Sequence, residues 1–111
     1  PDAVGGLGLV HTCVSKAVRD EHGLPLDAVE RVIDVLRIAT EAEVALVLKQ
    51  DDTGVWRVSM RSKGRVDVSQ VALSLGGGGH RFAAGFTGGV DNQQVLADVR
   101  AALDRVELQD S

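Results

Sequence analysis

Four consecutive glycines, Gly76–Gly79, followed directly by His80, constrain this chain more than any other segment. Ordering a glycine costs more conformational entropy than ordering any other residue, so a folded domain keeps such a run where another group must approach the backbone closely. The run follows an apolar helical pattern and ends in His80 and Arg81. Backbone N–H groups with no Cβ in the way, next to donor side chains, are typical of an anion site, most simply a phosphate site.

The positive charge of the chain is concentrated around these glycines. The 111 residues carry a formal net charge of −4, which argues against a protein that coats nucleic acid non-specifically. Residues 53–90 hold five basic side chains and one acidic side chain, whereas the other 73 residues hold seven basic and fifteen acidic ones. This asymmetry favours a small anionic ligand at one basic site over a long polyanion.

Length and composition predict one domain, residues 1–111, because 44% of the residues are hydrophobic and supply a core. The single cysteine, Cys13, excludes an internal disulfide, fits a reducing compartment and is interpreted as a small buried apolar residue. No signal peptide and no apolar run of membrane-spanning length is present, so we expect a cytoplasmic protein that does not contact a membrane. Because the chain opens on Pro1 without a methionine, we expect it to belong to a longer protein.

Hydrophobic periodicity predicts four strands and three helices. The predicted strands are Gly6–Ser15, Val44–Leu48, Val55–Arg61 and Gly85–Thr87. The predicted helices begin near Asp27, near Asp67 or Ser69, and near Asp91, and capping arrangements pair Asp27 with Glu30 and Asp91 with Gln94. Lys16–Leu24 is polar and is assigned to no element. The order predicts a single-domain α+β (mixed α/β) fold in which helices pack on a mixed sheet of about four to five strands.

The predicted strand Val55–Arg61 alternates between two kinds of side chain. One face carries Trp56, Val58 and Met60, and the other carries Arg57, Ser59 and Arg61. We interpret the apolar face as core, so Trp56 is predicted to pack there rather than to stack on a nucleotide base. Arg57 and Arg65 are interpreted as solvated surface charges, since lone surface arginines usually are.

The end of this strand and the glycine run together form the candidate phosphate site. Arg61 can offer a planar fork to phosphate oxygens, and Ser62 and Lys63 add a hydroxyl and a mobile cation. His80 can donate a hydrogen bond, and a positive charge when protonated, whereas a role for Arg81 stays open. These residues converge only if the intervening helix returns the chain to the Arg61 strand. The alternative is a flexible glycine loop beside an ordinary polar histidine.

The catalytic inventory of the chain is thin. The sequence contains no nucleophile elbow, no P-loop lysine and no Asp and His cluster suited to two metals. His11 and His22 have no metal-ligand spacing around them, and Glu41 and Glu43 are predicted to face water. We therefore interpret the chain as a phosphate binder whose chemistry is supplied from elsewhere.

Several motifs in fixed order resemble one known family. Their combined pattern, Arg61-Ser62-Lys63-Gly64, Val66-Asp67-Val68-Ser69, Ala72, GGGGH and Ala83-Ala84-Gly85-Phe86, resembles the C-terminal, DHH-associated substrate-binding domain of DHH-type phosphoesterases. Within that family the chain is most similar to the bacterial bifunctional oligoribonucleases that also act as 3'-phosphoadenosine 5'-phosphate phosphatases. The strong motifs span about residues 44–87, and the flanking elements fit the same domain.

The resemblance implies a division of labour between two domains. An N-terminal DHH domain, which this chain lacks, would hold two Mn²⁺ ions, and this chain would contribute no catalytic residue and no metal ligand. The implied substrates are short RNA oligonucleotides, dinucleotides and 3'-phosphoadenosine 5'-phosphate. The substrate-binding residues carried over by the motifs are Arg61, Ser62, Lys63, Gly77, Gly78, Gly79 and His80. The chain alone is expected to be inactive as a hydrolase.

Other functions remain compatible with the sequence. The chain could be a stand-alone nucleotide-binding module, or it could mediate self-association, for example as a homodimer. RecJ-type exonucleases and cyclic-dinucleotide phosphodiesterases share versions of the glycine–histidine segment. The Ala83-Ala84-Gly85-Phe86 continuation and the Arg61-Ser62-Lys63-Gly64 segment favour the oligoribonuclease group. The glycine-rich domain of alanyl-tRNA synthetases lacks the His-x-x-Ala-Ala-Gly continuation and is the weaker resemblance.

Overall fold

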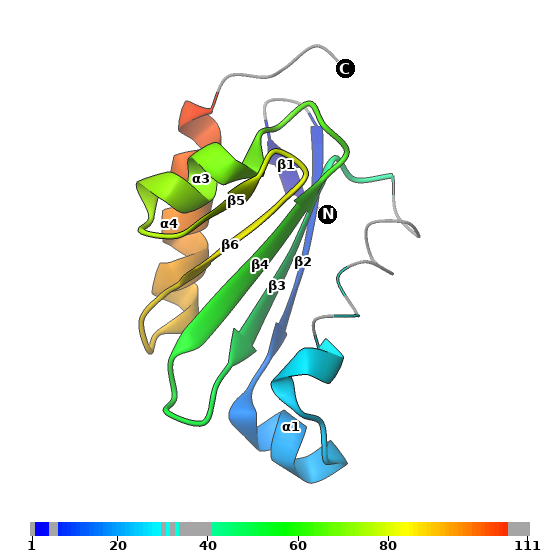
Figure 1. Cartoon of the computed structure of the whole chain (residues 1–111), viewed down its shortest axis with the longest axis vertical. Helices are drawn as coiled ribbons and strands as arrows, with labels where there is room; N and C mark the ends of the chain where they lie inside the picture. The colour runs from blue at the N-terminus through cyan, green and yellow to red at the C-terminus, as the bar shows by residue number, and fades with distance from the viewer. Residues whose placement is uncertain (1, 5–6, 30, 32, 34–40, 107–111) are drawn as a thin grey trace.

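The protein is built on a single mixed β-sheet, seen in a computed structural model that describes residues 2–4, 7–29, 31, 33 and 41–106 (Figure 1). The strands of these residues are β1 (Asp2–Val4), β2 (Leu7–Val14), β3 (Val44–Gln50), β4 (Trp56–Ser62), β5 (Gly78–His80) and β6 (Ala83–Thr87). Their order across the sheet is β1-β2-β3-β4-β6-β5. Strands β2 and β3 are parallel, and each other neighbouring pair is antiparallel. The predicted α+β fold is confirmed, with the short strands β1 and β5 added at its edges.

Helices α3 (Val68–Ser74) and α4 (Asn92–Arg105) begin where the sequence predicts. Asp67 caps α3 by accepting a hydrogen bond from the Ser69 backbone N–H, and Asp91 caps α4 by accepting from the N–H groups of Gln93 and Gln94. These short polar side chains satisfy N–H groups that the first helical turn leaves without partners.

Helix α1 (Lys16–His22) was not predicted, although the sequence carries both of its end signals. The Ser15 hydroxyl accepts from the Val18 N–H at its start, and Gly23 adopts a left-handed conformation with φ of 64° at its end. Residues 26–29, 31 and 33 are also helical. Asp27 lies inside this helical segment, so its predicted capping role is wrong; the Pro25 carbonyl accepts from the Ala28 N–H at this start. The predicted partner of Asp27, Glu30, lies outside the described residues.

The main core lies between one face of the sheet and the helices α3 and α4, which Figure 1 shows packed side by side. Strand β4 contributes Trp56, Val58 and Met60 to this core, as the alternation predicts. The Trp56 indole N–H donates to the Val90 carbonyl at 3.2 Å, which satisfies its one polar atom. Trp56 is therefore a core residue.

A second, smaller cluster lies on the opposite face of the sheet. Val29 and Ile33 pack there against Ala45 and Val47 of β3. This cluster covers the β2–β3 part of the face and does not include residues of β4, β5 or β6. The polar residues of β4 share this opposite face.

Cys13 does not lie in either cluster, contrary to the prediction that it is buried. Leu9 at the other end of β2 is 1% exposed and belongs to the main core, but Cys13 is exposed. An apolar strand sequence shows which side chains alternate but not how far along the strand the covering helices extend. Partial burial raises the pKa of the Cys13 thiol, so exposure alone does not make it a reactive thiolate.

Candidate anion-binding site

Strand pairing places Arg61 and His80 in one cross-strand row. Arg61 pairs with Ala83 of β6, and Ala83 pairs with His80 of β5. Directly opposite residues of antiparallel strands project from the same face of a sheet. Neighbouring strands lie about 4.8 Å apart, so the Arg61 and His80 backbones are separated by about 10 Å with only a small side chain between them. Helix α3 thus returns the chain to the Arg61 strand, as the predicted site requires.

The loop that follows Arg61 packs against the turn between β5 and β6. The Ser62 N–H donates to the Phe82 carbonyl at 2.9 Å, and the Arg81 Nε donates to the Gly64 carbonyl at 2.8 Å. The Arg81 guanidinium also lies 5.6 Å from the centre of the Phe82 ring. Arg81, whose role the sequence left open, therefore joins the basic loop to the glycine–histidine segment.

Ser62 and Glu43 form the interior of this loop. Ser62 is fully buried, its hydroxyl donates to Glu43 Oε2 at 3.0 Å, and the same hydroxyl accepts from the Gly64 N–H at 2.9 Å. Glu43 Oε2 also accepts from the Arg65 N–H at 3.0 Å. Glu43 is 8% exposed, so the prediction that it faces water is wrong. Ser62 shapes the loop from inside, and a direct contact between Ser62 and a ligand stays a prediction.

Two glycines of the run are required by packing within the chain. A Cβ on Gly77 would lie 2.1 Å from the Gly85 carbonyl oxygen, and one on Gly79 would lie 2.5 Å from the Ala84 Cα. Such contacts are far inside van der Waals range, so these glycines let the end of α3 and strand β5 lie directly on β6. Packing against β6 therefore explains why these two positions are glycines, and no ligand is needed for that explanation.

Gly78 differs from both neighbours. A Cβ built on it would have no described atom within 4 Å, and its backbone is not in the left-handed region. Gly78 pairs with Gly85, which pairs with Ser59, so the open space in front of Gly78 lies on the Arg61–His80 face. The described fold gives no steric reason for a glycine here, so Gly78 leaves its backbone open to an approaching group.

The backbone N–H groups of the run are only partly available. The Gly76 N–H donates to the Leu73 carbonyl, and the Gly77 N–H donates to the Ala72 carbonyl at 2.7 Å, so both end the helix α3. Strand β5 is the edge strand beyond β6 in the described sheet. Within the run, the Gly78–His80 segment is therefore the part with one edge that no described strand pairs with.

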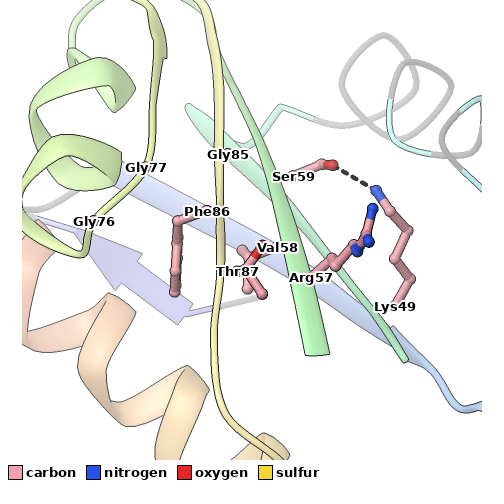
Figure 2. A pocket seen from close by; sticks show the side chains of 9 residues that line it. All are labelled: Lys49, Arg57, Val58, Ser59, Gly76, Gly77, Gly85, Phe86 and Thr87. Atoms are coloured by element: carbon pink, nitrogen blue, oxygen red, sulfur yellow. Dashed lines mark hydrogen bonds between the residues drawn. The ribbon is translucent and has the colours of Figure 1, made fainter. Parts of the chain in front are cut away.

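Lys49 and Arg57 lie beside a cavity of about 380 Å³ on the same face (Figure 2). Lys49 of β3 pairs with Arg57 of β4, and the Lys49 Nζ donates to the Ser59 hydroxyl at 2.8 Å. The cavity continues across β6 at Gly85 and Thr87. Burial, with the nearby guanidinium groups of Arg57 and Arg61, lowers the pKa of the Lys49 ammonium from 10.5 to about 8.

Sequence reasoning did not single out Lys49 or Ser59. The available signals were the continuation of the apolar run Val44–Leu48 into Lys49 and the position of Ser59 between two arginines of the alternating face. Neither signal shows that the two side chains meet, because the pairing of β3 with β4 sets that contact. The remaining predicted residue, Lys63, is exposed at the loop.

Among the described residues, no group of three or more His, Cys, Asp or Glu side chains is arranged to hold a metal ion. The family resemblance places the two-metal centre in a DHH domain and not in these residues. In the same part of the chain, no helix combines the length and hydrophobicity needed to cross a membrane.

A family model of the DHHA1 domain matches residues 9–107 of the chain. Over 78 residues the chain is 41% identical to the bifunctional oligoribonuclease and PAP phosphatase NrnA of Thermus thermophilus. That match covers 66% of the chain and 24% of the relative, so the chain spans about a quarter of the length of that protein.

Solved structures share the fold at lower identity. An exopolyphosphatase-related protein from Bacteroides fragilis has a TM-score of 0.76 and 19% sequence identity to this chain. The match covers 86% of this chain and 28% of the Bacteroides fragilis chain. The C-Ala domain of Aquifex aeolicus alanyl-tRNA synthetase matches 88% of this chain and 95% of its own, with a TM-score of 0.64 and 16% identity. Such different proteins sharing one fold means that function has to be argued from the site.

Proposed function

This chain belongs to the DHHA1 domain family, and we propose that it grips the substrate of a DHH-type phosphoesterase. In this proposal it binds the phosphate and terminal nucleotide of short RNA, dinucleotides or 3'-phosphoadenosine 5'-phosphate. The observation that carries the proposal is the row that joins Arg61 and His80 across Ala83 on one face of the sheet. The similarity to an oligoribonuclease and PAP phosphatase supports this choice of substrates.

Arg61 and His80 have complementary tasks at a phosphate. The Arg61 Nη1 donates to the Met60 carbonyl at 3.0 Å, and in this proposal other N–H groups of the guanidinium are directed at phosphate oxygens and neutralise charge that develops on them. His80 is exposed at the edge strand and can donate one hydrogen bond from the other side. The glycine segment leaves room beside His80 for a sugar or base. This arrangement holds and orients an anion and does not itself supply a nucleophile.

The hydrolytic chemistry belongs to a different part of the protein in this proposal. A DHH domain would hold two Mn²⁺ ions, which would supply the metal chemistry of hydrolysis. We assign no hydrolytic step to the described residues of this chain. The chain on its own is expected to bind nucleotides without turnover in the cytoplasm, and the whole protein is expected to hydrolyse them.

Isothermal titration calorimetry of the chain with 3'-phosphoadenosine 5'-phosphate tests the proposal. Arg61→Gln is expected to weaken binding about tenfold, because a charge-assisted contact is lost. His80→Asn tests the second contact. Arg105→Gln is the matched control, since Arg105 lies exposed on α4, which packs on the other face. Equal affinities of the wild type, Arg61→Gln and His80→Asn would overturn the proposal.

A second experiment separates a gripping domain from a stand-alone nucleotide-binding module. The full-length protein is assayed on a diadenylate with and without the same substitutions. Loss of turnover in Arg61→Gln and His80→Asn supports the gripping role. Full turnover in both variants would show that this site does not serve the hydrolase.

A further inference from the structure

The cationic face of the sheet extends beyond the Arg61–His80 row. We define this face by Lys49 of β3, by Arg57, Ser59 and Arg61 of β4, and by Gly78 and His80 of β5. Ser59, Gly85 and Gly78 form a second cross-strand row, which lies two residues along the strands from the row of Arg61, Ala83 and His80. The cavity of about 380 Å³ opens at this second row, beside Lys49 and Arg57.

Lys49 and Arg57 pair with each other in a third row, and the Lys49 Nζ reaches back to donate to the Ser59 hydroxyl of the second row, so cationic groups line the cavity. Lys49 is 4% exposed, and its pKa is lowered by burial and by the charges of Arg57 and Arg61. Arg57 forms an ion pair with Asp51 at 3.3 Å, and Asp51 also accepts from the Thr53 hydroxyl at 2.6 Å, so one carboxylate balances part of this positive charge. A bound anion would offset the mutual repulsion of the three cations in a place partly shielded from water.

The shape of the second row leaves room for such a group. No described atom lies within 4 Å of a Cβ built on Gly78, and Gly78 shares its row with Gly85, which also has no side chain. Figure 2 shows the Lys49 amine and the Arg57 guanidinium directed to one side of β4, beside the Ser59 hydroxyl. These two charged residues and Ser59 line one cavity, so a small anion in it would face all three.

We propose that the Lys49–Arg57–Ser59 cavity is a second phosphate subsite that holds another phosphate of the ligand bound at Arg61 and His80. This inference rests on the proposed function. Alternate residues of a strand are about 7 Å apart, so Ser59 lies about 7 Å and Arg57 about 14 Å along β4 from Arg61. A second phosphate of one nucleotide ligand would therefore enter the cavity at its Ser59 end, where the Lys49 amine lies. The preferred ligand class is a nucleoside that carries two phosphates, or a dinucleotide with a terminal phosphate.

Two ligands that differ by one phosphate test this subsite. Adenosine 5'-monophosphate and 3'-phosphoadenosine 5'-phosphate are titrated into the chain at one ionic strength, because salt screens charge–charge contacts. The wild type is expected to bind the bisphosphate about tenfold more tightly. Lys49→Gln and Arg57→Gln are expected to reduce that ratio to about twofold, with the loss falling mainly on the bisphosphate.

Each outcome has a distinct meaning. Arg57 is 53% exposed, so Arg57→Gln retains a folded chain even if Lys49→Gln does not. An unchanged ratio in folded Arg57→Gln, or equal weakening of both ligands, overturns the second subsite while leaving the proposed function intact. Unchanged binding of both ligands in Arg61→Gln, or a wild type that binds neither ligand, overturns the proposed function and this inference with it. Arg105→Gln controls for the loss of one positive charge.

Discussion

The two faces of strand β4 have opposite roles, although their residues alternate one by one. Trp56, Val58 and Met60 are at most 5% exposed and pack under α3 and α4. Arg57, Ser59 and Arg61 lie on the other face, where the smaller apolar cluster reaches only β2 and β3. One face of β4 therefore stabilises the domain, and the other face carries the candidate ligand site.

The contrast shows how a small domain can carry a cationic site without losing its core. The apolar face gains burial energy from every second residue, and the charges on the other face stay clear of that packing. Substitutions on the first face should therefore change the free energy of unfolding. Substitutions on the second should change ligand affinity.

The largest expected effect compares Met60 with its neighbour Arg61. Met60→Ala removes a fully buried side chain and should lower the free energy of unfolding by about 2–5 kcal/mol. Arg61→Gln should change it by less than about 1 kcal/mol. Urea unfolding followed by circular dichroism measures both. Similar losses in the two variants would mean that the faces are not divided as described.

The Lys49 charge belongs to the cationic face but is buried, so it lowers the stability of the fold. This cost should depend on pH. The folded chain releases the Lys49 proton at a pH of about 8, whereas the unfolded chain holds it to about 10.5. The unfolded state therefore binds more protons in this window, and raising the pH from 8 to 10.5 should stabilise the fold by up to about 3 kcal/mol.

Urea midpoints across this window check the prediction, with Lys49→Met as the matched variant. The charges of Arg57 and Arg61 act on Lys49, and Asp51 accepts a hydrogen bond from Arg57. The wild type should gain stability relative to Lys49→Met as the pH rises. A constant difference between the two would show that Lys49 is not destabilised by its surroundings.

Glu43 should have an intermediate effect, because it holds the basic loop from inside. Glu43→Ala leaves the Ser62 hydroxyl and the Arg65 N–H without their acceptor and should cost about 1–3 kcal/mol. Glu43→Gln keeps an amide oxygen and should cost less. Nucleotide affinity should fall in the same order, since the loop follows Arg61. Unchanged affinity in a folded Glu43→Ala variant would separate this loop from the site.

The smallest effect on stability is expected at Gly78. Gly78→Ala meets no described atom within 4 Å and should change the free energy of unfolding by less than about 1 kcal/mol. Its affinity for 3'-phosphoadenosine 5'-phosphate should nevertheless fall, because the added methyl group enters the ligand space. Gly77→Ala is the contrasting variant, since its Cβ would clash with the Gly85 carbonyl. Full affinity in Gly78→Ala would contradict the prediction that the ligand lies against the Gly78 backbone.

Local patterns in the sequence predicted the local parts of this structure. The alternation of β4 assigned both of its faces, and Asp67 and Asp91 marked helix starts, because each signal lies within a few residues of its effect. Helix α1 was missed although Ser15 and Gly23 carried the usual end signals.

Burial set by distant segments could not be predicted in this way. Cys13 is exposed and Glu43 is buried, the reverse of expectation, because coverage by helices and a loop far along the chain decides both. The same limit applied to the site. Arg61 and His80 were predicted to share one site only if the intervening helix returned the chain to the Arg61 strand, and strand pairing places them on one face. Lys49 was overlooked because its contact with Ser59 also depends on pairing.

An amide chemical-shift titration of the chain with 3'-phosphoadenosine 5'-phosphate tests the central claim most directly, because it reports on both faces at once. We expect the largest shifts at Arg61–Lys63 and Gly78–His80, with small shifts in α4. Arg61→Gln, titrated in parallel, should lose those shifts at the same ligand concentration. Shifts centred on α3 and α4, or shifts at the cationic face that persist unchanged in Arg61→Gln, would contradict the account.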